Sequence, residues 1–126
     1  MRNLVIILLL IIALPASSQE LQCGNTDVTI TKTGEWESTK YQVIAQLKNR
    51  KAELWVDSVD YVISKCVLDS KNRNKILINA YCGGSGCSPH TYIIINAQTE
   101  VVELVPVMHK PNLTQAEEII GKSIVK

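Results

Sequence analysis

The sequence predicts an α+β domain in which an antiparallel meander sheet of about five strands has one helix before it and one C-terminal helix. Apolar and polar residues alternate over much of residues 52–107, as they do in half-buried strands. Apolar residues are instead spaced by three and four in residues 38–51, which is typical of a helix with one buried face. Because the helix and strand signals occupy separate parts of the chain, we expect an α+β domain rather than alternating βα units.

The first 18 residues have the three parts of a secretory signal peptide. Arg2 supplies a positive charge, residues 4–14 form an unbroken apolar run, and Ala16 and Ser18 are small residues two positions apart. The apolar run is shorter than the roughly 20 residues that span a bilayer. We therefore expect cleavage after Ser18 and a single exported domain over residues 19–126, periplasmic or secreted, without stable membrane insertion after cleavage.

The charge balance argues against nucleic acid and anionic membranes as partners. The chain has 13 Lys and Arg residues against 12 Asp and Glu residues, and loss of Arg2 with the signal peptide leaves a formally neutral domain. Binding to nucleic acid or to an anionic membrane needs clustered positive charge. We therefore expect a protein partner and no nucleic acid, and the sequence predicts no cofactor and no metal.

Four cysteines, an even number, predict two disulfides in an exported chain, and three pairings are possible in principle. Cys82 and Cys87 bracket only four residues, so a hairpin that turns there holds them near each other. Cys23 and Cys66 then form the second pair, whose bridge also ties down the N-terminal segment of the domain. We expect the bridges Cys82–Cys87 and Cys23–Cys66.

A strand and then a helix open the predicted domain. In residues 27–33 apolar side chains alternate with threonines, which predicts a strand. In residues 38–51 the apolar spacing predicts a helix that Ser38 caps, with acidic residues near its positive end. The apolar stripe of this helix consists of Tyr41, Ile44, Ala45 and Leu47.

Four consecutive antiparallel strands follow the predicted helix. β-branched residues are common in this part of the chain and favour strands. A polar turn at 71–74, a glycine-rich segment at 83–86 and a turn at 96–99 separate them. The β segments cover residues 52–70, with a bend near Asp57 and Ser58, then 76–82, 87–95 and 100–107.

The last predicted element is a C-terminal helix. Thr114 and Glu117 have the spacing of a capping box, in which each side chain satisfies a free backbone amide. The triplet at 112–114 is also a glycosylation sequon if the host is a eukaryote, with Asn112 as the acceptor. The apolar residues on one side of this helix are Ile119, Ile120 and Ile124.

The glycine-rich segment between the two cysteines is the candidate functional site. Glycines adopt the positive backbone dihedrals of a tight turn, so a purely structural turn is one interpretation. The other is a rigid, protruding tip that enters a partner's cleft with little loss of conformational entropy. Ser85 is not predicted to be a nucleophile, because Cys87 stands where a nucleophile elbow needs glycine. The candidate binding residues are Gly83, Gly84, Ser85, Gly86 and His90.

Residues 75–99 resemble a pattern found in small bacterial periplasmic proteins. The segment combines a strand, two cysteines four residues apart, and a second strand that ends in an Asn-Ala-Gln-Thr turn. It is similar to the inhibitor-of-vertebrate-lysozyme family, in which a similarly spaced disulfide holds a loop that plugs a lysozyme active site. The resemblance implies a scaffold role for Cys82 and Cys87. That family's loop carries a histidine, whereas here the nearest histidine, His90, lies past Cys87.

Other classes of protein fit the sequence less well. A small secreted hydrolase or redox enzyme would need a nucleophile with a base, or a Cys-x-x-Cys pair at a helix start. A zinc site would use Cys82, Cys87, His90 and His109, but an oxidising compartment favours disulfides. A cystatin-like inhibitor shares the order of elements but not the Gln-x-Val-x-Gly signature, and a structural envelope component is a further alternative. We therefore predict a non-enzymatic, exported binding protein that inhibits or neutralises another exported protein.

Overall fold

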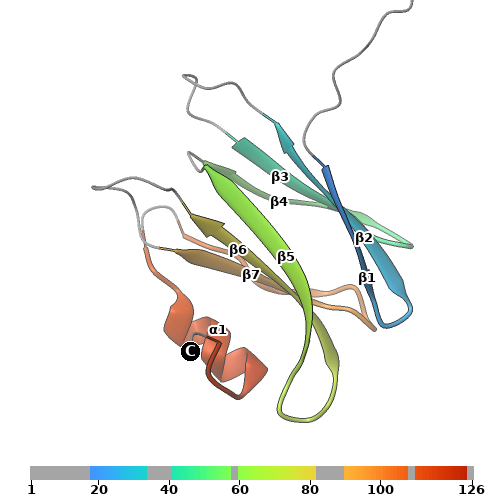
Figure 1. The fold of residues 1–126 in the computed structure, drawn as a ribbon, viewed down its shortest axis with the longest axis vertical. Coiled ribbons are helices and arrows are strands. Elements are labelled where there is room, and N and C mark those ends of the chain that lie inside the picture. Colours follow the sequence, from blue (N-terminus) through green and yellow to red (C-terminus); the bar gives the residue numbers. More distant parts are fainter. Residues whose placement is uncertain (1–17, 34–40, 58–59, 82–89, 108–109, 125–126) are drawn as a thin grey trace, which may run out of the picture.

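The structure, a computed structural model, shows two four-stranded antiparallel sheets and one short helix (Figure 1). It describes residues 18–33, 41–57, 60–81, 90–107 and 110–124. Both sheets are meanders in which each strand pairs with the next along the chain. The first sheet contains β1 (Ser18–Cys23), β2 (Thr26–Thr33), β3 (Tyr41–Gln46) and β4 (Lys51–Asp57). The second contains β5 (Tyr61–Leu68), β6 (Asn74–Tyr81), β7 (Thr91–Asn96) and β8 (Val102–Leu104), and α1 (Leu113–Ile120) follows it.

The main hydrophobic core lies between the two sheets, because every second side chain of each inner strand points to the same face. The first sheet and its turns contribute Val28, Ile30, Val43, Ala45, Leu47, Ala52 and Leu54, all buried. The second sheet and its turns contribute Val62, Ile76, Ile78, Ala80, Ile93, Ile95 and Ala97, also buried.

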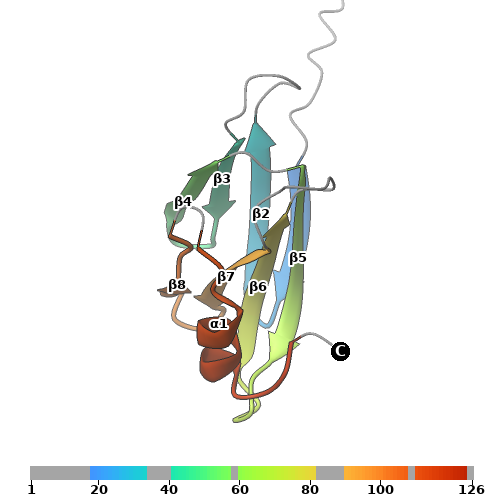
Figure 2. The ribbon, with the colours of Figure 1, turned by 90° about the vertical axis from the view of Figure 1, so that its left-hand side faces the viewer.

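A second, smaller core lies between the outer face of the second sheet and α1 (Figures 1 and 2). Leu77, Tyr92 and Ile94 pack there against Ala116 and Ile120 of the helix. Burial on both faces explains why β6 and β7 have nearly continuous apolar runs instead of a strict alternation. The helix covers only part of this outer face.

The predicted helix over residues 38–51 is wrong. Within the part of that segment that the structure describes, residues 41–46 form β3, residues 47–50 form a turn, and β4 begins at Lys51. Residues 34–40, which include the proposed N-cap Ser38, lie outside the described residues. Within the described residues, the strand–helix–meander order that suggested a cystatin-like inhibitor is therefore not present.

Burial on the inner face explains the strand at this position. Val43 and Ala45 are 0% exposed and Leu47 is 2% exposed, so alternate residues face the core. The predicted helical stripe combined Ile44, on the opposite face, with Ala45 and Leu47 and omitted Val43. Two adjacent β-branched residues at 43 and 44 also favour a strand, and burial against the second sheet outweighs a helical spacing of only a few residues.

The other predicted strands are confirmed, but they belong to two sheets rather than to one meander of about five strands. Residues 27–33 lie in β2, and the β segment 52–70 divides at the expected bend into β4 and β5. The later segments correspond to β6, β7 and a shorter β8. The segment predicted to be a helix instead supplies β3 and the start of β4, and the apolar faces of the two sheets pack against each other.

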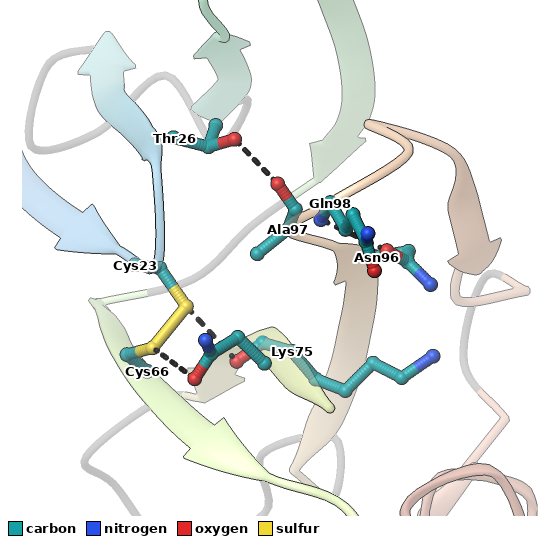
Figure 3. Close-up of a disulfide and its surroundings, with 8 residues drawn as sticks. Cys23, Thr26, Cys66, Lys75, Asn96, Ala97 and Gln98 are labelled. Carbon is teal, nitrogen blue, oxygen red and sulfur yellow. Dashed lines mark hydrogen bonds between the residues drawn. A yellow bond between two sulfur atoms is a disulfide. The ribbon is translucent and has the colours of Figure 1, made fainter. Parts of the chain in front are cut away.

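The predicted bridge between Cys23 and Cys66 is confirmed, and it joins the two sheets (Figure 3). Cys23 ends β1 and Cys66 lies in β5, with their Cα atoms 5.2 Å apart. The side chain of Gln19 in β1 also bonds to β5, accepting from the backbone N–H of Ser64 at 3.3 Å. The predicted bridge Cys82–Cys87 and most of the predicted signal peptide lie outside the described residues.

The C-terminal helix is confirmed, but the predicted capping box is wrong. The N-cap residue is Asn112, and its side chain makes no capping hydrogen bond. Thr114 lies inside the helix, so it cannot cap it. At the other end Gly121 adopts a left-handed conformation, with φ 79°, and its N–H bonds to the carbonyl of Glu117. Among the residues described, no helix has the length and apolar character needed to cross a membrane.

Candidate functional site

The candidate binding residues of the glycine-rich segment are placed only in part. Gly83, Gly84, Ser85 and Gly86 lie outside the described residues, and His90 is the first residue described after them. In the sequence, these residues lie between Tyr81, the last residue of β6, and His90, which directly precedes β7. The part of the candidate site that the structure describes therefore lies around Tyr81 and His90.

Three aromatic side chains stack in a row across the end of the second sheet. Tyr61 and Tyr81 are directly paired across β5 and β6, and their ring centroids are 5.1 Å apart. The imidazole of His90 lies 4.4 Å from the ring of Tyr81, at an interplanar angle of 7°. Cross-strand aromatic pairs of this kind stabilise a sheet and fix each other's rotamers. We call Tyr61, Tyr81 and His90 the aromatic row.

A hydrogen bond fixes the orientation of His90. Its Nδ1 lies 3.2 Å from the Oδ1 of Asn79. Because an amide oxygen only accepts, the Nδ1 atom donates in this arrangement. The exposed histidine is thus held in a fixed orientation against the ring of Tyr81.

An apolar groove of about 560 Å³ lies beside the aromatic row, on the part of the second sheet that α1 leaves uncovered. His90 belongs to both features, its partner Asn79 lines the groove, and Ile63 on the groove wall is 48% exposed. We call this hollow the outer-face groove. Its lining consists of the apolar Ile63, Leu77, Tyr92, Pro111, Leu113 and Ile124 and the polar Lys65, Asn79 and His90.

Tyr92 forms part of the groove lining and stays protonated over the whole physiological range. Burial, together with the negative charge of Glu117, raises the pKa of its phenol above the ordinary value. The side chain therefore contributes an apolar ring and a neutral hydroxyl group rather than a charge.

Asn112 holds the groove wall formed by Pro111 and Leu113 against the sheet. Its Oδ1 accepts a hydrogen bond from the backbone N–H of Tyr92, and its Nδ2 donates to the carbonyl of the same residue, both at 2.8 Å. The side chain thus replaces a neighbouring strand at this point of β7. Because Asn112 is only 5% exposed and its Nδ2 is engaged, the sequon does not offer a glycan acceptor in the folded protein.

The structure describes only part of the zinc alternative. In the described ranges no group of three or more His, Cys, Asp or Glu side chains is placed to hold a metal ion. Three residues of the zinc alternative, Cys82, Cys87 and His109, lie outside those ranges. The fourth, His90, contacts Asn79 and Tyr81.

Sequence reasoning missed the aromatic row and the groove. The hairpin turn predicted at 71–74 would have placed Tyr61 and Tyr81 near each other on adjacent strands. The alternation in β5 would have placed Ile63 and Lys65 on the same face as Tyr61. What the sequence did not reveal is that this face remains partly open, because that depends on where α1 packs.

No protein-family model, curated protein or solved structure matches this chain.

Proposed function

We propose that this chain is an exported binding protein that inhibits or neutralises another exported protein, and that it contacts its partner through the aromatic row and the outer-face groove. The observation that carries the proposal is the pre-stacked row of Tyr61, Tyr81 and His90 at the rim of an apolar groove. The Cys23–Cys66 bridge supports the proposed export of the protein, since disulfides persist where the environment is oxidising.

The chemistry of this surface fits a protein segment. Tyrosine is enriched among the residues that dominate protein interfaces, because it buries a large area and keeps a polar group at the rim. The row is held by stacking before any partner arrives, so binding orders few side chains and loses little entropy. The groove would take an apolar side chain of the partner, while Lys65 at its edge favours a neighbouring acidic group.

The glycine-rich segment of the original hypothesis is connected to this surface by the chain itself. It lies within residues 82–89, which directly follow Tyr81 and directly precede His90 in the sequence. In the proposal the segment and the row contact the same partner.

The first test uses a vertebrate lysozyme, the partner class that the sequence resemblance implies. Purified protein lacking residues 1–18, oxidised to form its disulfides, is titrated into lysozyme by calorimetry, and bacterial cell-wall lysis is followed in parallel. Saturable binding with loss of lysis is the expected result. Lysis that continues unchanged at saturating concentrations would exclude lysozyme as the neutralised protein.

Variants of the binding surface test where the partner binds. Tyr61→Ala removes an exposed ring at the end of the row and should weaken binding at least about tenfold, with little change in the melting temperature. Val101→Ala, at another exposed apolar position outside the row and the groove, is the matched control and should bind as the parent does. Ser85→Trp adds bulk to the glycine-rich segment and should also weaken binding. Unchanged affinity in both Tyr61→Ala and Ser85→Trp would remove this surface from the interface.

A further inference from the structure

A second hollow of about 440 Å³ lies at the opposite end of the sandwich from the aromatic row. β6 runs between the two, with Asn74 at this hollow and Tyr81 in the row, roughly 23 Å apart at the rise of a β-strand. We call it the turn-end cavity, because the turns β1–β2, β3–β4, β5–β6 and β7–β8 all contribute to it. It is lined by Gly24, Asn25, Thr26, Lys48, Asn49, Asn72, Arg73, Asn74, Ala97, Gln98 and Glu100.

Side-chain amides dominate the lining of this cavity. A primary amide offers two donors and an acceptor in one plane, and a sugar hydroxyl group both donates and accepts. Neighbouring amides therefore match the alternating donors and acceptors of a polyhydroxylated molecule. The amide residues are Asn25, Asn49, Asn72, Asn74 and Gln98.

A nearly buried carboxylate adds a fixed acceptor. Glu100 is 5% exposed, and its Oε1 accepts a hydrogen bond from the backbone N–H of Asn49 at 3.1 Å. Its second oxygen makes no hydrogen bond to the residues that the structure describes. Glu100 also has a φ of 59°, a left-handed conformation that is unfavourable for glutamate. The fold therefore holds this side chain in the cavity wall against a local backbone preference.

The charges around the cavity balance. Arg73 and Lys48 are positive, and Glu100 is negative. The Nε of Arg73 donates to Oδ2 of Asp69 at 2.8 Å, so a second carboxylate compensates its charge. A balanced set favours a neutral ligand over an anion, and it leaves the remaining guanidinium N–H groups as donors.

A disulfide and a hydrogen bond between turns hold the walls of the cavity together (Figure 3). The Cys23–Cys66 bridge lies next to Gly24, and Oδ1 of Asn74 is 3.8 Å from the sulfur of Cys66. The hydroxyl group of Thr26 donates to the carbonyl of Ala97 and so connects the turns of the two sheets. A rigid wall reduces the entropy lost on binding.

We propose that the turn-end cavity binds a neutral, polyhydroxylated small molecule of the size of a monosaccharide or disaccharide. Its volume lies in the range of small-molecule sites. The site is separate from the aromatic row, so the proposal does not depend on the partner protein.

The test is ligand-observed saturation-transfer NMR on the oxidised protein, with glucose, galactose, N-acetylglucosamine and maltose as probes and glucuronate as an anionic comparison. We expect saturation transfer from at least one neutral sugar, and a titration then gives its affinity. Glu100→Gln exchanges an acceptor for a donor, and Gln98→Ala removes one amide, so each should weaken binding about tenfold. Gln115→Ala removes an exposed amide on α1 and is the matched control, expected to bind as the parent does.

Three results would overturn the proposal: no transfer from any neutral sugar, transfer that persists unchanged in both cavity variants, or stronger binding of glucuronate than of the neutral sugars. If Gln98→Ala loses sugar binding but binds lysozyme with the affinity of the parent, the two sites are independent.

Discussion

At the residue scale, ionisable groups buried at the start of β6 connect the second sheet to its turn. The ammonium group of Lys75, whose side chain is 2% exposed, lies 2.6 Å and 2.8 Å from the two carboxylate oxygens of Glu103. Asp69 lies 4.0 Å away on the other side. A charge in this position is tolerated only because it is paired and hydrogen-bonded. The network therefore binds β6, β8 and the β5–β6 turn together.

Asp69 makes the stability of the protein sensitive to acid. Burial by itself raises the pKa of this carboxyl group, but hydrogen bonds from Arg73 and Lys71 and the charge of Arg73 outweigh it, so the pKa is lower than its ordinary value. A carboxyl pKa that is lower in the folded state stabilises the fold above the unfolded pKa of about 4, and this contribution is lost as the pH falls through the folded value.

We therefore expect the free energy of unfolding, measured by urea titration, to fall as the pH is lowered below about 4. Asp69→Asn should be less stable than the parent at pH 7 and should lose less stability on acidification. If the free energy of unfolding falls equally with decreasing pH in parent and variant, Asp69 is not the group responsible.

The side chain of Asn112 should be worth more to stability than its position at a helix N-cap suggests. Asn112→Ala leaves the buried N–H and carbonyl of Tyr92 without their partners, each costing about 1–3 kcal/mol. We expect the free energy of unfolding to drop by about 2–6 kcal/mol, measured by urea titration. Gln115→Ala on the exposed side of α1 is the control, and an equal small effect in both variants would contradict this assignment.

At the element scale, the strand at residues 41–46 can be tested against the helix that the spacing predicted. Val43 faces the core in the strand but lies outside the predicted helical stripe. Val43→Thr keeps shape and β-branching but buries a hydroxyl group, so we expect a loss of about 1–3 kcal/mol in urea unfolding. Gln46→Thr, at an exposed position of the same strand, should change stability by less than about 0.5 kcal/mol. A neutral Val43→Thr would support the helix instead.

At the scale of the whole molecule, the Cys23–Cys66 bridge adds a covalent cross-link between the two sheets. It joins residues 43 positions apart, and closing a loop of that length stabilises a fold by about 4 kcal/mol through the entropy of the unfolded chain. The double variant Cys23→Ala with Cys66→Ala should lose about that amount in urea unfolding. A variant that unfolds at the same urea concentration as the parent would show that packing alone holds the sheets together.

The sequence predicted most strands because their alternation is a local pattern. It also predicted the pairing of Cys23 with Cys66, by elimination. It did not predict β3, because Tyr41, Ile44, Ala45 and Leu47 satisfy a helical spacing within a strand. It did not identify Tyr61 and Tyr81 as a stacked pair, although the turn predicted at 71–74 places them opposite each other in β5 and β6, because nothing local shows that their face of the sheet stays partly open.

The sequence by itself determined the local features of this protein: where the chain alternates, where it turns, and which cysteines remain to be paired. Tertiary structure alone decided that the strands divide into two sheets, that α1 covers only part of the outer face, and that four turns meet at a polar cavity. The physical reason is that a single strand gains little by forming alone, whereas burial between layers is shared by residues far apart in the chain. The groove and the cavity are places where that burial is incomplete, and their positions follow from how the layers meet.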